Sequence, residues 1–311
     1  MSDSRLVWRR AVVVRVLALG ALLALGALSA GACAPRRAVV TSPTVSPPAS
    51  SATTGGAIPA TGSISATSTP QPPMTAPATV SARLYFVRHG SVGVAGRRVL
   101  ASGPAVAAMR DLALGPTTSE SNAGLKSEIP AGTTISSVKV DPNGIATVDL
   151  NGAFASAGSD ASMRLRVGQV VCTLTQFPNV RRVRILVDGA PVARLGPVAI
   201  AKPLARSDLE SSLPAILVET PVPYSEVASP MNLSGSADVF EAQFVAELLA
   251  PSGARIARQI VRATSGTGTR GSFSATVRFA TQRHGGGTLV VYEPSPKDRS
   301  AINVVRIPVM F

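Results

Sequence analysis

The chain has 311 residues, enough for two ordinary domains once its non-globular parts are set aside. Lys and Arg number 30 against 17 Asp and Glu, a formal net charge of +13, and only 4% of the residues are aromatic. Aromatic side chains are too scarce for stacking on nucleic acid bases, so nucleic acid is not an expected partner.

The first 32 residues have the pattern of a secretory signal. Basic residues come first, an apolar run from Ala11 to Ala30 follows, and small residues lead into Cys33. The pattern resembles a bacterial lipoprotein signal, in which the cysteine receives diacylglycerol and becomes the new amino terminus. Ala30 stands where such signals usually carry Leu, so an uncleaved single-span anchor is the alternative. Both interpretations predict a protein held on the extracytoplasmic face of the cell membrane.

Residues 33–81 are predicted to be a disordered linker. From Ala38 to Ser81 the chain has eight prolines, many Ser, Thr and Ala, and no charged residue. No helical or strand period occurs there, so no core can form. A flexible coil of this length spans roughly 36 Å root-mean-square, which suits a tether.

Residues 82–202 are expected to form a small α+β domain with the order β-α-β-β-α-β and helices segregated on a mixed sheet. Asp141-Pro-Asn-Gly144 is a strong hairpin signal, Pro104 suits the first position of a helix, and Gly115-Pro116 ends that helix. The expected strands are 83–88, 135–140, 145–150 and 183–187, with a short additional strand at 99–100.

The second helix of this domain is the element around which the rest is organised. Apolar residues recur at three- and four-residue steps from Met163 to Phe177. Ser159 or Asp160 can cap the start of the helix, and Pro178 cannot continue it.

Residues 203–311 are predicted to form an all-β immunoglobulin-like sandwich. Short runs that alternate between apolar and polar residues recur at regular spacing with turn residues between them. The seven expected strands are 215–219, 231–237, 240–249, 256–264, 273–279, 288–293 and 303–311.

The first domain resembles the GerMN (sporulation and spore germination) domain. The motifs that carry the resemblance are Leu84-Tyr-Phe86, Leu114-Gly-Pro-Thr117, Ala146-Thr-Val-Asp-Leu150 and the segment Gln169–Pro178. The resemblance implies a fold like that of the ring-building modules of secretion and sporulation assemblies. It also implies a surface lipoprotein.

The second domain resembles Gmad2, the immunoglobulin-like domain that accompanies GerMN in spore-germination-type proteins. The carrying residues include Ser229-Pro230, Leu233-Ser-Gly-Ser-Ala237 and Tyr292-Glu-Pro-Ser295. Neither resemblance shows that the host sporulates.

Several residues of the GerMN-like motifs are expected to be mainly structural: Gly115, Pro116, Gln169, Thr173, Leu174 and Phe177. The polar positions on the long helix can bond neighbouring loops or mark a side that faces a partner, and we favour the structural role. Asp149 is expected to cap the helix near Ala161 or to bond a loop after the hairpin.

The basic excess lies in the first domain, where Ala82–Lys202 has 14 Lys and Arg against 7 acids. Such a charge favours anionic lipid headgroups or an anionic wall polymer, and a solvated surface is the plainer alternative. The best candidate for an anion- or partner-binding patch is Arg164, Arg166, Arg181, Arg182 and Arg184. For Arg182 and Arg184 the alternative is a sheet edge that charge protects from pairing.

We expect no catalytic residues, metal site or cofactor. His89 and His284 are the only histidines, and no His, Cys and carboxylate cluster has metal-ligand spacing. Gly266-Thr-Gly-Thr-Arg-Gly271 matches a dinucleotide-binding string, but it lies between two strands and does not open a helix. Cys172 is expected to be a small buried hydrophobe.

These observations predict a non-enzymatic, lipid-anchored envelope protein, a scaffold or interaction module of an actinobacterium-like Gram-positive cell. Its partner would be an envelope protein or a second copy of the chain. The alternative is binding of cell-wall carbohydrate or anionic polymer through the basic first domain.

Overall fold

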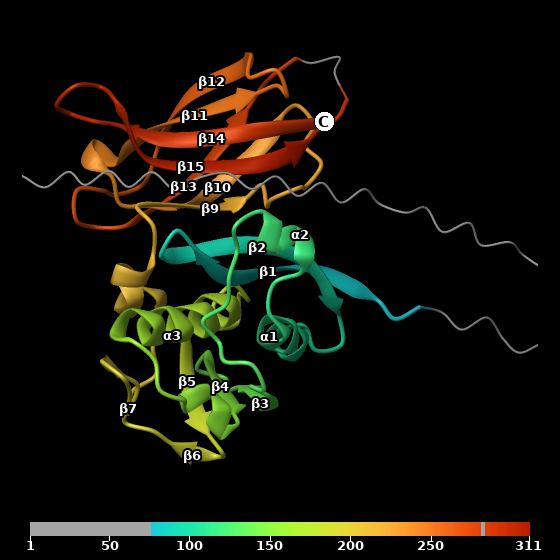
Figure 1. Cartoon of the computed structure of the whole chain (residues 1–311), viewed down its shortest axis with the longest axis vertical. Helices are drawn as coiled ribbons and strands as arrows, with labels where there is room; N and C mark the ends of the chain where they lie inside the picture. The colour runs from blue at the N-terminus through green and yellow to red at the C-terminus, as the bar shows by residue number, and fades with distance from the viewer. Residues whose placement is uncertain (1–75, 281–283) are drawn as a thin grey trace, which may run out of the picture. The chain divides into compact units, whose positions relative to one another are not determined.

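The computed structural model describes residues 76–280 and 284–311 (Figure 1). The predicted signal, Cys33 and most of the predicted linker lie outside the described residues. In the described residues, the α+β part contains a hairpin, three α-helices, a short 3-10 helix, a mixed sheet and short terminal strands. Its elements are β1 (Thr79–Arg88), β2 (Ser91–Leu100), α1 (Pro104–Leu114), α2 (Thr118–Asn122), β3 (Ile135–Val140), β4 (Ile145–Leu150), η1 (Gly152–Ala155), α3 (Asp160–Leu174), β5 (Arg182–Val187), β6 (Ala190–Pro191), β7 (Arg194–Leu195) and β8 (Val198–Ala199).

The main sheet of this part has the order β3-β4-β5-β6. β3 and β4 are antiparallel around the turn at Asp141–Gly144, whereas β4 and β5 are parallel and α3 connects them. The predicted class, helices on a mixed sheet, is therefore confirmed.

The amino-terminal strand differs from the prediction. β1 pairs with β2, in register from Thr79↔Leu100 to Arg88↔Ser91, and the two strands form a separate two-stranded sheet. Outside this pairing, Val87 of β1 forms an isolated bridge with Lys126. β1 thus begins inside the segment predicted as linker. The expected short strand at 99–100 is ten residues long. Glycines and a pair of arginines obscure the alternation of β2 in the sequence.

The β1–β2 hairpin is buried on both faces. Leu84 and Phe86 belong to the core beneath α1 and α3, and Tyr85 belongs to a second cluster with Val94 and with Leu217 of the β-sandwich. Figure 1 shows the hairpin between the helices and the sandwich. A strand covered on both sides needs apolar residues at successive positions, which explains the sequence Leu-Tyr-Phe-Val.

The helix α3 begins at Asp160 as the pattern predicts, but it ends at Leu174, three residues before the predicted end at Phe177. Ser159 is its N-cap, whose side chain accepts a hydrogen bond from the amide of Ser162 at 3.2 Å. The side chains from Val167 to Leu174 are all buried because α1, β1, β5 and the connector η2 (Arg206–Ser212) surround the helix. The helix is therefore a central element of the α+β part.

The remaining strands form the predicted sandwich. They are β9 (Ile216–Thr220), β10 (Met231–Ala237), β11 (Gln243–Leu249), β12 (Arg255–Arg262), β13 (Gly271–Val277), β14 (Gly286–Pro294) and β15 (Ala301–Met310). One sheet has the order β13-β10-β9 and the other β12-β11-β14-β15. Phe244 and Phe273 meet between the sheets, edge to face, with ring centroids 4.8 Å apart.

The strand predicted at 240–249 begins at Gln243 in the structure, three residues later than expected. Phe240–Ala242 form the short helical turn η3, in which Glu241 has a φ of 52° and Ala242 a φ of 56°. Left-handed backbone cannot continue a strand. The alternation of apolar and polar residues runs through this turn and conceals it.

Candidate functional site

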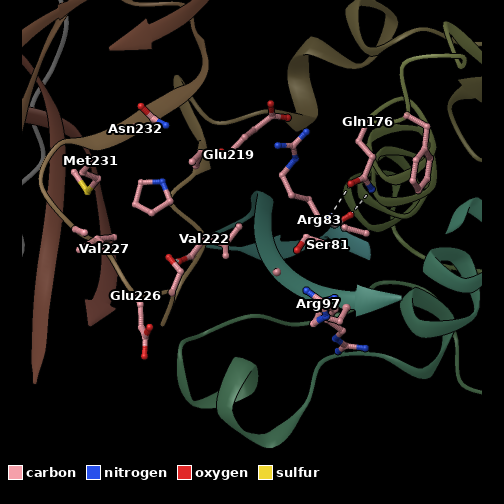
Figure 2. A pocket seen from close by; sticks show the side chains of 18 of the residues that line it. Ser81, Arg83, Arg97, Gln176, Glu219, Val222, Glu226, Val227, Met231 and Asn232 are labelled. Carbon is pink, nitrogen blue, oxygen red and sulfur yellow. Dashed lines mark hydrogen bonds between the residues drawn. The ribbon is translucent and has the colours of Figure 1, made fainter. Parts of the chain in front are cut away.

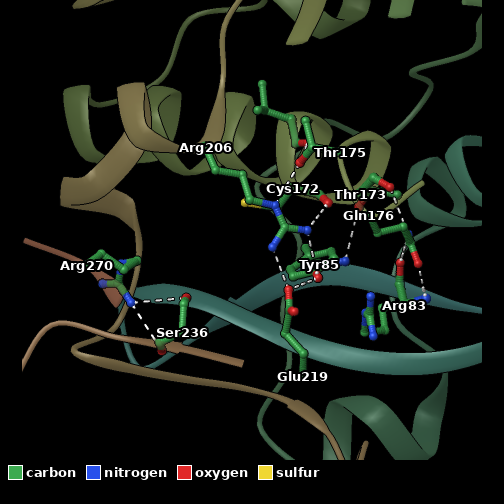
Figure 3. Close-up of polar contacts among 11 residues, drawn as sticks. Arg83, Tyr85, Cys172, Thr173, Thr175, Gln176, Arg206, Glu219, Ser236 and Arg270 are labelled. Carbon is green, nitrogen blue, oxygen red and sulfur yellow. Dashed lines mark hydrogen bonds and ion pairs between the residues drawn. The ribbon is translucent and has the colours of Figure 1, made fainter. Parts of the chain in front are cut away.

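A polar network joins the two domains (Figure 3). Arg206 of the connector η2 pairs with Glu219 of β9 at 2.5 Å and donates a hydrogen bond to the hydroxyl of Tyr85 at 2.9 Å. The Tyr85 hydroxyl donates to the same Glu219 carboxylate. Arg206 also donates to the Cys172 carbonyl at 2.9 Å and to the Thr175 hydroxyl at 2.7 Å. One guanidinium thus links β1, α3 and β9.

Arg206 and Glu219 each stabilise the charged form of the other. Burial opposes the charged form of Arg206, but Tyr85, Cys172 and Glu219 raise its pKa above the ordinary value. Burial also acts to raise the pKa of Glu219, yet Arg206 and the Tyr85 hydrogen bond hold it below its usual range. Burial raises the pKa of Tyr85, so its hydroxyl remains a hydrogen-bond donor.

An apolar contact lies beside this network. Tyr85, Val92 and Val94 of the hairpin cluster with Leu217 of β9, and Val222 packs against them. A Cβ on Gly96 would lie 2.4 Å from Val222 Cγ2. The absence of a side chain at Gly96 therefore permits the close approach of β2 to the chain that follows β9.

A groove of about 770 Å³ opens where the two domains meet (Figure 2). Arg83, Arg97 and Gln176 line it from the α+β part, and Val227 and Met231 line it from the sandwich. Figure 2 shows these two sets on opposite sides of the pocket. A second cavity with residues from both domains is smaller, about 340 Å³.

The arginines of the groove differ in how they are bonded. Arg97 donates to the Glu120 carboxylate and to the carbonyls of Asp111 and Gly115. Arg98 donates to the side chain and carbonyl of Thr79. The Nε of Arg83 is buried and has no hydrogen-bond partner in the described residues.

Comparison with known families agrees with this architecture. A model described as "Sporulation and spore germination" (Germane) matches residues 83–193, and one described as "Immunoglobulin-like domain of bacterial spore germination" (Gmad2) matches residues 215–300. The chain has a GerMN domain followed by a Gmad2 domain.

Three solved structures are similar to the chain. The first GerMN domain of the sporulation protein GerM from Bacillus subtilis is 23% identical, with 42% of this chain and 99% of that chain covered and a TM-score of 0.34. The tandem GerMN domains of the same protein are 17% identical, with coverages of 66% and 63% and a TM-score of 0.38. A protein described as a lipoprotein from Clostridium perfringens is 22% identical, with coverages of 43% and 93% and a TM-score of 0.32. A comparison with curated proteins gives no match.

The predicted arginine patch of the GerMN domain is divided by the fold. Arg166 is 4% exposed and does not belong to a binding surface, because its guanidinium donates to the carbonyls of Glu128, Phe154 and Ser156. Burial lowers the pKa of Arg166. The prediction that Arg166 belongs to a binding patch is therefore wrong. Its charge suggested an exposed position on α3, but the side chain is buried against the segment that contains η1.

The other four arginines are exposed. Arg164 and Arg182 line one depression with Lys202, and Arg182 Nη1 lies 3.6 Å from an Asp208 carboxylate oxygen. Arg184 lies on the outer face of the sheet, and Arg181 precedes β5.

The alternative that Arg182 and Arg184 protect a sheet edge is wrong. β5 lies between β4 and β6, and Val183 also bridges to Leu204, so both sides of the strand are paired. The arginines instead occupy the face of the sheet opposite the helices.

The polar GerMN motif residues hold neighbouring segments in place. Gln169 Oε1 accepts from the Glu128 amide at 2.8 Å, and Thr173 Oγ1 accepts from the Tyr85 amide at 3.1 Å. Both side chains are fully buried and cannot face a partner. Gln176, which lines the groove, bonds both the amide and the carbonyl of Arg83. These contacts give hydrogen-bond partners to backbone groups of Arg83 and Tyr85 that do not pair with β2.

The remaining motif residues have plain structural positions. Gly115 has a φ of 85° and ends α1, and Pro116 follows it. Leu174 is fully buried in the core, and Phe177 packs partly buried against it and lines the groove. Asp149 accepts a hydrogen bond from the Gly189 amide at 2.8 Å, so it holds the turn after β5 and does not cap α3.

The described residues contain no group of three or more His, Cys, Asp or Glu that could hold a metal ion. His89 lies in the β1–β2 turn, and His284 precedes β14. Gly266–Gly271 connects two strands, β12 and β13. Cys172 is buried, and burial raises the pKa of its thiol to about 11. Within residues 76–280 and 284–311, no helix is long and apolar enough to cross a membrane.

Sequence reasoning missed the residues of the domain joint. The sequence predicts a polar connector at Arg206 and an ordinary strand at Glu219, and Arg83 flanks an apolar run. The one usable signal was Tyr85, a hydroxyl within a strand buried on both faces, because a buried hydroxyl needs a partner.

Proposed function

We propose that the protein is a non-enzymatic, lipid-anchored envelope module that binds another protein through a surface made by its GerMN and Gmad2 domains together. The anchor is a diacylglycerol on Cys33, which the export signal in the sequence supports. The description of the first family refers to sporulation and spore germination, that of the second to spore germination, and neither names a reaction.

The observation that carries the proposal is the joint of Tyr85, Arg206 and Glu219. The described residues of both domains belong to one compact unit. A partly buried ion pair that shares its carboxylate with a tyrosine hydroxyl favours one arrangement of its neighbours over others. A fixed arrangement lets two domains present one continuous binding surface, as a scaffold requires.

The test is site-specific photocrosslinking in intact cells. A photoreactive residue at exposed Asn232, on the rim of the groove, should give one dominant adduct with an envelope protein or a second copy of the chain. The same residue at exposed Arg262, on β12, is the matched control and should give little adduct. Equal, diffuse adducts from both sites would contradict the proposal.

A second candidate is binding of an anionic wall polymer or wall carbohydrate. The observation that favours it is the outer face of the GerMN sheet, where Lys139 of β3 and Arg182 and Arg184 of β5 are exposed on either side of β4. Cosedimentation with purified wall should then decrease with salt and with the double substitution Arg182→Gln/Arg184→Gln. The matched control is Arg255→Gln/Arg258→Gln on β12. Salt-independent or absent cosedimentation would reject this candidate.

A further inference from the structure

We propose that the groove between the two domains binds a short peptide segment of the partner, with a carboxylate of that segment paired to Arg83. The inference rests on the proposed function and names the chemistry of the ligand. It follows from the bonding of Arg83, the charges around it and the lining of the groove.

Arg83 is held in place by its backbone but not by its side chain. Gln176 accepts from its amide and donates to its carbonyl, which fixes this position of β1 at the groove. Its guanidinium has no hydrogen bond or ion pair within the described residues, and its Nε is buried. Figure 2 shows the Arg83 side chain among the residues that line the pocket.

The nearby acids do not supply the missing acceptor. Glu219 interacts electrostatically with Arg83, but its carboxylate is bonded by Arg206 and Tyr85. Glu226 lines the groove and forms no ion pair in the described residues. A buried donor without an acceptor is unfavourable, and a guanidinium pairs best with a planar carboxylate or a phosphate that accepts two hydrogen bonds.

The rest of the lining favours a peptide over a polyanion. Phe177, Val222, Val227 and Met231 present apolar surface, and the prolines of the sandwich side add to it. Arg97 and Arg98 also line the groove but are bonded within the described residues, and Glu219 is paired with Arg206. Glu226 forms no ion pair there and would repel a chain of closely spaced phosphates. A segment with one negative charge and apolar neighbours satisfies Arg83 without meeting this repulsion.

The size of the groove agrees with such a ligand. Its volume of about 770 Å³ lies in the range of roughly 300–1,000 Å³ that is usual for sites that bind small ligands and short segments. Residues of both domains line it, so the occupant contacts GerMN and Gmad2 at once.

The experiment measures binding of the full chain in detergent to immobilised octapeptides of Leu, Val and Pro with one central Glu. Peptides with Gln in place of Glu are the charge control. Arg83→Gln is the test variant, and Arg262→Gln on β12 is its matched control. Because the Arg83 guanidinium bonds nothing in the described chain, Arg83→Gln should fold and melt as the unsubstituted chain does.

The expected result is retention of the unsubstituted chain and of Arg262→Gln by Glu peptides, with binding at least about tenfold weaker for the Gln peptides and for Arg83→Gln. Soluble poly(glycerol phosphate) should compete poorly. Equal binding by Arg83→Gln, failure of every Glu peptide to bind, or stronger Arg83-dependent binding of poly(glycerol phosphate) would each overturn the inference. An adduct from Asn232 that Arg83→Gln leaves unchanged would overturn the inference while the proposed function stands.

Discussion

The guanidinium of Arg206 lies over the ring of Tyr85, with Cζ 4.9 Å from the ring centroid, and donates a hydrogen bond to the hydroxyl of that ring. The two residues belong to the connector and to the first strand of the GerMN domain, 121 positions apart. Through Glu219 the same guanidinium reaches the Gmad2 domain. The stability of the whole described unit should therefore depend on this one side chain.

Arg206→Met should lower the free energy of unfolding by about 2–3 kcal/mol. The substitution leaves Glu219 and the Tyr85 hydroxyl without their partner in a mostly buried site, although partial exposure of the pair reduces the cost. Urea denaturation followed by circular dichroism measures the change. Arg182→Met, which removes an exposed ion pair at 3.6 Å, should cost less than about 1 kcal/mol.

The double variant Arg206→Met/Glu219→Met provides a stricter check. Replacing both charges by apolar groups removes the uncompensated carboxylate, so the double variant should be more stable than Arg206→Met alone. If the two losses simply add, the ion pair is not the source of the effect.

Glu219→Gln should remove part of the acid sensitivity of the protein. The pKa of Glu219 is lower in the folded chain than its ordinary value of 4.5, so the folded state binds fewer protons. The stability that results is fully present above about pH 4.5 and is lost as the pH falls through the folded pKa. The difference in unfolding free energy between the unsubstituted chain and Glu219→Gln should therefore shrink below pH 4.5. A difference that stays constant down to pH 3 would contradict this linkage.

Gly96→Ala should destabilise the joint by about 1–3 kcal/mol, because the new Cβ would lie 2.4 Å from Val222 Cγ2. Val222→Ala removes Cγ2, so the double variant Gly96→Ala/Val222→Ala should regain part of the stability that Gly96→Ala loses. Thermal unfolding of the single and double variants gives the coupling. Gly286→Ala, whose added Cβ meets nothing within 4 Å, is the control and should be nearly neutral.

Thr173→Val should cost about 1–3 kcal/mol, because it leaves the buried amide of Tyr85 without an acceptor. Hydrogen exchange resolves the effect, since the Tyr85 amide should exchange faster while amides of the Gmad2 strands keep their rates. Thr147→Val on the outer face of the sheet is the control, and its effect should stay within about 0.5 kcal/mol. Unchanged protection at Tyr85 would show that the hydroxyl is not its essential partner.

Elements whose faces are buried at a regular period were predictable from local pattern. α3 followed from apolar steps of three and four, and the seven Gmad2 strands followed from alternation between turn residues. β2 was predicted too short because Gly93, Gly96 and Arg97 interrupt its alternation, although β1 pairs with it throughout. Apolar periodicity indicates which side of an element is buried. It does not predict a strand such as β2, in which glycines leave several positions without a side chain.

The candidate site was far less predictable. The arginines chosen from the sequence were a cluster along the chain, and the fold buries Arg166 while it leaves Arg182 and Arg184 on an open sheet face. Arg83, whose guanidinium has no partner in the part of the chain that the structure describes, carries no local signal of that state. Whether a guanidinium is bonded depends on acceptors from distant segments.

By itself the sequence determined two modules, their order and the faces each would bury, because local spacing decides which side chains an element can hide. Only the tertiary structure decided that Tyr85, Arg206 and Glu219 meet, and that beside them opens a groove with an arginine unpaired within the described residues. Charges and cavities arise from segments that the chain brings together across more than a hundred residues, and no local pattern encodes that distance in space.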